Sequence, residues 1–124
     1  MNPKIMVVDD EDVIRETLEL MLEKEGYEIK LANNGEEFLE KLDEFQPDLV
    51  TLDIMMPGLT TIEIFQKIKE KKSNPKIIIV SAAGISGEEK ERILSLGNIV
   101  DYICKPFNSE ELQKTLDKHI KRIK

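Results

Sequence analysis

The stretch Ile5-Met6-Val7-Val8-Asp9-Asp10 decides the fold class, because a short apolar run rich in β-branched residues ends there in two carboxylates. Three later runs end in the same way, in Asp53, Ser81 and Lys105: D-L-V-T-L-D at 48–53, I-I-I-V-S at 77–81 and Y-I-C-K at 102–105. Helix-length segments separate the runs, which is typical of buried parallel strands that alternate with helices. Parallel strands deliver their carboxyl ends to one edge of the sheet, where such folds bind ligands. The sequence therefore predicts that three carboxylates, one hydroxyl and one amine meet at that edge.

Strand and helix alternate five times along the chain. We expect strands at about 4–8, 27–31, 48–53, 76–81 and 100–104, and helices at about 12–24, 35–44, 61–71, 87–96 and from 109 to near the end. Five such units with short connections predict a single α/β domain over residues 1–124, a doubly wound (βα)5 sandwich around a five-stranded parallel sheet. The flavodoxin-like order 2-1-3-4-5 is common for such sheets and places the ligand crevice between the first and third strands.

The expected helix starts are marked by a capping side chain three residues before a glutamate. In this arrangement each side chain can satisfy an unpaired backbone N–H of the first turn. Gly26 stands where the first helix should end, as glycine does in many C-terminal caps. The four capping pairs are Asn34 with Glu37, Thr60 with Glu63, Ser86 with Glu89, and Asn108 with Glu111.

The predicted strand order brings Asp9, Asp10 and Asp53 together. Neighbouring strands lie about 4.8 Å apart, so these carboxylates would repel one another unless a proton or a cation joins them. Mg²⁺ fits best, because it binds through one or two carboxylates, keeps waters and leaves room for a phosphate oxygen. An acidic run before a helix can also serve only the helix N-terminus, but that reading does not explain why all these residues fall at strand ends.

Composition excludes several classes of function. Charged residues make up 35% of the 124 residues, and the net charge of −7 argues against direct binding to nucleic acid or to an anionic membrane. No segment has the length of a membrane span, and the N-terminus has no signal peptide pattern. The single cysteine, Cys104, fits a reducing compartment and lies within an apolar run, so we expect inert packing and a cytoplasmic protein. The lone histidine, His119, is expected on the surface of the last helix, away from the active edge.

Over essentially its whole length the chain resembles the receiver domain of two-component response regulators. The motifs that carry the resemblance are V-V-D-D-E at 7–11, L-D-I-M-M-P-G at 52–58, V-S-A at 80–82 and D-Y-I-C-K-P-F at 101–107. The resemblance implies the 2-1-3-4-5 strand order, a sensor histidine kinase or phosphotransfer protein as phosphodonor, and a downstream protein target. It implies no contact with nucleic acid or membrane by this domain, and catalysis only of its own phosphorylation and dephosphorylation.

The resemblance also implies roles at the acidic edge. Asp53 is the expected phosphoacceptor, attacking a phosphohistidine to form an acyl phosphate. Asp10 and Asp53 would hold Mg²⁺ together with the backbone carbonyl of Met55, and Asp9 would act mainly through a bound water.

The remaining motif residues are expected to read the phosphorylation state. Lys105 would pair with one phosphoryl oxygen, and Ser81 would donate a hydrogen bond to another after its loop shifts inward. Tyr102 matches the aromatic residue that changes rotamer with that shift. The peptide between Lys105 and Pro106 is expected to be cis.

Three departures from the family pattern are visible. Thr61 stands where the family usually has glycine, and the segment 97–102 is one residue longer than the family's Gly-Ala-x-Asp-Tyr. Met55 and Ala83 occupy variable positions beside the site, and their apolar side chains cannot orient a water, which predicts a slowly decaying phosphoryl form. The chain carries no output domain, so we expect either a stand-alone receiver or part of a longer regulator.

Other classes fit the residues less well. A flavodoxin-like electron carrier would need a phosphate-binding first loop, whereas this loop is Asp-Asp-Glu-Asp and the chain has no tryptophan to stack on a flavin. A magnesium-dependent aspartate phosphatase would have two aspartates separated by one residue after its first strand. A phosphorylation-independent interaction module of the same fold is the main alternative.

Overall fold

The computed structural model describes the chain apart from residues 1, 55–57, 59–60, 82–86, 96–97 and 121–124 and the side chains of 61–62, 89–90 and 93. Its centre is one parallel sheet in the order β2-β1-β3-β4-β5, as the sequence predicts. Each strand boundary lies within one residue of the expected position. The strands are β1 (Lys4–Val8), β2 (Glu28–Ala32), β3 (Leu49–Asp53), β4 (Lys76–Ser81) and β5 (Ile99–Cys104).

The helices alternate with the strands, and the last three of them end earlier than expected. They are α1 (Asp12–Lys24), α2 (Gly35–Phe45), α3 (Thr61–Ile68), α4 (Gly87–Leu94) and α5 (Ser109–Asp117). The expected end of α3 at residue 71 was wrong. The backbone N–H groups of Lys72 and Ser73 donate to the Asp43 carboxylate at 3.0 and 3.2 Å, which ties this segment to α2 instead of continuing the helix.

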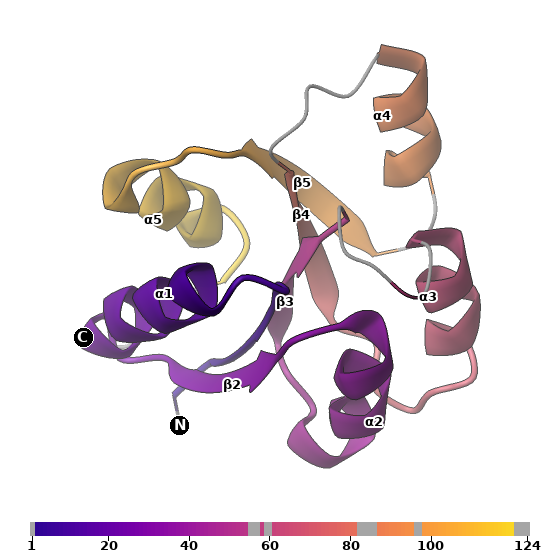
Figure 1. The fold of residues 1–124 in the computed structure, drawn as a ribbon, viewed down its shortest axis with the longest axis horizontal. Coiled ribbons are helices and arrows are strands. Elements are labelled where there is room, and N and C mark those ends of the chain that lie inside the picture. The colour runs from indigo at the N-terminus through magenta and orange to yellow at the C-terminus, as the bar shows by residue number, and fades with distance from the viewer. Residues whose placement is uncertain (1, 55–57, 59–60, 82–86, 96–97, 121–124) are drawn as a thin grey trace.

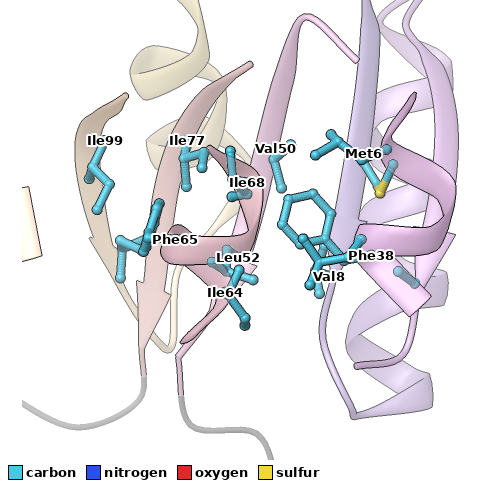
Figure 2. Packing of buried hydrophobic residues seen from close by; sticks show 14 residues of the cluster. Met6, Val8, Phe38, Val50, Leu52, Ile64, Phe65, Ile68, Ile77 and Ile99 are labelled. Atoms are coloured by element: carbon cyan, nitrogen blue, oxygen red, sulfur yellow. The ribbon is translucent and has the colours of Figure 1, made fainter. Parts of the chain in front are cut away.

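Helices cover both faces of the sheet and divide the core into two clusters. Figure 1 shows α1 and α5 on one side of the sheet and α2, α3 and α4 on the other. On the α2–α3 side, Phe38 from α2 and Ile64, Phe65 and Ile68 from α3 lie against residues of β1, β3 and β4 (Figure 2). The cluster on the other side contains Leu18 and Leu22 of α1 and Leu112 and Leu116 of α5. Burial on both faces explains why the strands read as continuous apolar runs.

Two of the four expected capping pairs lie in the described part of the chain. In both, the asparagine side chain caps the helix as predicted. Asn34 Oδ1 accepts from the Glu37 N–H at 2.8 Å, and Asn108 Oδ1 accepts from the Glu111 N–H at 2.8 Å. Thr60 and Ser86 lie outside the described residues. Gly26 follows the α1 C-cap with φ +94°, a left-handed conformation that favours glycine, so this prediction is also confirmed.

The residue that lengthens the segment 97–102 forms a β-bulge near the start of β5. Ile77 of β4 pairs with Ile99, but Ile78 pairs with Asp101, so Val100 has no partner in the ladder. Ile99 packs in the α2–α3 cluster, whereas Val100 packs in the cluster with α1 and α5. The bulge thus absorbs the insertion before the ladder reaches Tyr102, and β5 begins at Ile99, one residue earlier than expected.

Among the helices of the described residues, none combines the length and the apolar character that crossing a membrane requires.

Candidate functional site

The carboxyl ends of β1 and β3 bring the acidic residues together. Asp9 and Asp53 are 2% and 3% exposed, whereas Asp10 and Glu11 are exposed to solvent. One carboxylate oxygen from each of these four residues lies within 4.8 Å of the others. The sequence predicted three members of this group and missed Glu11, which is the next residue of the same acidic run.

Lys105 carries the positive charge of the site. Its Nζ lies 2.7 Å from Asp9 Oδ2, 3.3 Å from Asp53 Oδ2 and 3.6 Å from Glu11 Oε1. Burial alone would lower the pKa of Lys105, but the hydrogen bond to Asp9 and the charge of Asp53 raise it above its ordinary value. The ammonium therefore stays charged and neutralises part of the carboxylate cluster.

The backbone around Lys105 directs this side chain into the site. Its N–H donates to the Ser81 carbonyl at 2.8 Å, which joins the ends of β4 and β5. The Lys105-Pro106 peptide is cis, as expected from the sequence.

Two further residues expected at the site lie on these neighbouring strands. Ser81 is fully buried at the end of β4, which pairs with β3 so that Val80 stands beside Asp53. Tyr102 of β5 is partly buried and packs against the α2–α3 cluster. Met55, expected as a ligand through its backbone carbonyl, lies outside the described residues, as does Ala83.

The donor set fits a hard divalent cation. Carboxylate oxygens on two adjacent strand ends are the ligands that Mg²⁺ prefers, and the two exposed side chains leave an open side for waters or a phosphate. Asp9 is already occupied: Oδ2 accepts from Lys105, and Oδ1 accepts from the Glu11 N–H at 3.0 Å. Asp53 Oδ2 also accepts from Lys105, at 3.3 Å, whereas Asp10 and Glu11 are the exposed carboxylates of the cluster.

Sequence comparison finds a matching family profile and related regulatory proteins. Residues 5–117 match the profile of the response regulator receiver domain. The chain is 44% identical over 110 residues to the transcriptional regulatory protein ResD of Bacillus subtilis, covering 88% of this chain and 44% of that protein. It is 37% identical to the alkaline phosphatase synthesis transcriptional regulatory protein PhoP of the same organism, covering 98% of this chain and 50% of PhoP. The chain thus spans about half the length of these curated relatives.

Solved structures show the same fold. The response regulator TrrA of Thermotoga maritima, solved in complex with Mg²⁺ and beryllofluoride, is 41% identical with a TM-score of 0.78, and the match covers 95% of this chain and 99% of TrrA. The chemotaxis protein CheY4 of Vibrio cholerae is 29% identical with a TM-score of 0.86, over 97% of this chain and all of CheY4.

The strand order, the acidic edge with its lysine and the match over residues 5–117 agree with one another. This chain belongs to the response regulator receiver domain family of two-component systems.

Proposed function

We propose that the chain accepts a phosphoryl group on Asp53 from the phosphohistidine of a sensor kinase or phosphotransfer protein. The observation that carries the proposal is the position of Asp53, which is buried between the acidic strand end of β1 and the Lys105 ammonium, 3.3 Å away. A carboxylate at this position can act as the phosphoryl acceptor, because the negative charge of the resulting acyl phosphate can be neutralised by the neighbouring ammonium.

The proposed transfer needs few protein groups. An Asp53 oxygen forms the bond to phosphorus while the phosphorus–nitrogen bond of the donor breaks, and the donor imidazole keeps the electron pair of that bond. Asp10 and Asp53, with the Met55 carbonyl and with Asp9 through a water, would hold Mg²⁺, which would supply charge neutralisation for the phosphoryl oxygens. We propose that Lys105 exchanges its contacts with Asp9 and Asp53 for a phosphoryl oxygen.

The proposed switch follows from that exchange. Ser81 ends the strand next to β3, so its hydroxyl can donate to the phosphoryl group once the segment behind it moves inward. The phosphoryl group then favours one of two pre-existing arrangements, and Tyr102 reports the change on the surface that a downstream protein reads. We propose no reaction on a separate small-molecule substrate.

An apolar groove beside the site supports a protein as the phosphodonor. A pocket of about 580 Å³ lies between α1 and the segment that follows β5. Its lining includes Ile14, Leu18, Met21 and Phe107, and it reaches Glu11 and Lys105 of the site. Val13 and Leu20 of α1 are also 71% and 63% exposed. Apolar surface next to reacting groups is typical of a surface that binds a partner protein.

The test is an NMR titration with Mg²⁺ and then beryllofluoride, which mimics an acyl phosphate. We expect shifts at Asp53 and Ser81, at Lys105, and along β5. Asp53→Asn should lose the beryllofluoride response and all acid-labile, kinase-dependent phosphorylation, because an amide cannot form the acyl phosphate.

Asp48→Asn is the matched control, since it makes the same change just before the opposite end of β3. It should leave both responses intact. Undiminished labelling of Asp53→Asn would contradict the assignment. A wild-type spectrum unchanged by beryllofluoride would favour the phosphorylation-independent interaction module.

A further inference from the structure

Arg15 lies one turn into α1 and reaches back to the acidic strand end. Its Nη1 donates to the backbone carbonyl of Asp9 at 2.6 Å, and its Nη2 pairs with the carboxylate of Asp12. The Arg15 side chain is 14% exposed, whereas that of Asp12 is 79% exposed. This arginine is therefore largely buried against the loop, unlike an ordinary surface ion pair.

The Asp9 carbonyl is at the point where β1 leaves the sheet. The Asp9 N–H still donates to the Ala32 carbonyl at 3.1 Å, as the last bond between β1 and β2. β2 ends at Ala32, and the N–H of the following residue, Asn33, donates to the Glu37 carboxylate at 3.2 Å. Within the described residues, the hydrogen bond that the Asp9 carbonyl accepts comes from Arg15, so a side chain completes what the strand ladder no longer supplies.

The two contacts of Arg15 enclose the segment 9–12. Nη1 binds the Asp9 carbonyl and Nη2 binds the Asp12 carboxylate. Because the guanidinium is planar and rigid, it fixes the distance between these two groups. Asp10 and Glu11, whose carboxylates belong to the acidic cluster, lie between these two points. The α1 N-cap residue, Glu11, makes no side-chain capping bond, so the Arg15 contacts add order that the helix start lacks.

We propose that Arg15 is a positioning residue that holds the backbone of Asp9–Asp12 so that the carboxylates of Asp10 and Asp53 converge on one cation. The proposal rests on the Mg²⁺ site of the proposed function. It is not an electrostatic aid: the positive charge of Arg15 next to the site disfavours a cation. Positioning by Arg15 should therefore raise the Mg²⁺ affinity, whereas its charge should lower it. Removing Arg15 weakens binding if positioning dominates and tightens it if charge dominates.

The experiment measures Mg²⁺ affinity without any phosphodonor, from amide chemical shifts of residues 9–12 and 53 in wild type, Arg15→Gln and Arg15→Lys. We expect both variants to bind Mg²⁺ about tenfold more weakly, the usual loss when a residue behind a metal ligand is removed. Lysine keeps the charge but has one nitrogen in place of the guanidinium pair, so it should not restore the affinity. Arg92→Gln is the control, because it removes an arginine from an exposed position of α4 and should bind like wild type.

Variants must be compared at equal folded population, so unfolding curves and the spectrum of the remaining amides are recorded for each. If Arg15→Gln does not fold, Arg15→Lys decides the outcome alone. Affinities within twofold of wild type, or tighter binding by Arg15→Gln, would overturn the positioning role while leaving the proposed function standing. A wild-type chain that does not bind Mg²⁺ would overturn both.

Discussion

Thr51 is a buried residue of β3 whose hydroxyl has no hydrogen-bond partner among the described residues. It lies two residues before Asp53, between Val7 of β1 and Ile78 of β4, and is 2% exposed. Among the described side chains its Oγ1 is a buried polar atom without a hydrogen bond. Such a group costs free energy, because it loses water on folding and gains nothing in return.

We predict that Thr51→Val raises the free energy of unfolding by about 1 kcal/mol, since valine has nearly the same shape without the hydroxyl. Denaturant unfolding measures the change. Thr115→Val is the matched control: its Oγ1 donates to the Glu111 carbonyl at 2.9 Å, so the same substitution removes a bond that is made. A Thr51→Val chain less stable than wild type would show that the hydroxyl has a partner in solution.

The site residues differ in how far the sequence could assign them. Asp9, Asp10, Asp53, Ser81 and Lys105 could be placed because each ends an apolar run, and strand ends meet at one edge of a parallel sheet. Arg15 could not, because nothing in a helical sequence tells which exposed-looking side chain folds back onto a carbonyl six residues earlier. The only hint was a single basic residue in the acidic first turns of α1.

At the level of elements, the bulge in β5 shows how the sheet accepts an insertion. A regular strand alternates its side chains between faces, and one additional residue would invert everything after it. Val100, left unpaired, packs in the cluster with α1 and α5, the following Asp101 pairs with His119 just after α5, and Tyr102 stays on the α2–α3 side. Lys105 therefore still reaches the acidic edge.

Deleting Val100 should restore a regular ladder without inverting any side chain. We predict that this deletion folds, with a loss of about 1 kcal/mol for the apolar surface of one half-buried valine, and keeps its response to Mg²⁺ and beryllofluoride. Deleting Ile103 is the control, because it shifts Lys105 by one residue in the regular part of β5, beyond the bulge, and should abolish the response. Loss of the fold after deletion of Val100 would mean that the bulge is required for stability.

At the level of the whole molecule, the end of α5 is held against the sheet by two contacts. His119 Nε2 lies 2.9 Å from Asp101 Oδ2, and the His119 carbonyl accepts from Lys76 Nζ at 2.7 Å. The His119 side chain is only 18% exposed and is paired with Asp101 of β5, so it is less exposed than an ordinary surface residue. The last helix is thus connected to the strand that carries Tyr102.

This pair predicts a pH dependence of stability. Burial would raise the pKa of Asp101, but hydrogen bonds from His119 and from the Tyr102 N–H, with Lys118 nearby, hold it below its ordinary value. A lowered pKa in the folded state stabilises the fold above the unfolded value, about 3.9, and this contribution is lost as the pH falls through the folded value.

We predict that Asp101→Asn lowers the free energy of unfolding by about 1 kcal/mol near pH 6 and that its difference from wild type shrinks below about pH 4. Urea unfolding at a series of pH values measures both. Glu88→Gln removes a carboxylate from an exposed position of α4 and should show no comparable difference. A constant gap between Asp101→Asn and wild type from pH 3 to 7 would contradict the assignment.

The sequence by itself determined the order of elements, the two-sided burial of the sheet and the edge at which the polar strand ends gather. Periodicity and strand ends are local properties, and the geometry of parallel sheets converts them into a shared location. Only the tertiary structure decided which side chains meet at the site: Lys105 bonds to Asp9 and Asp53, and Arg15 binds the Asp9 carbonyl. It also decided that Val100 forms a bulge and that His119 pairs with Asp101. These contacts depend on how side chains from different elements fill the same space, which packing determines and local sequence patterns do not encode.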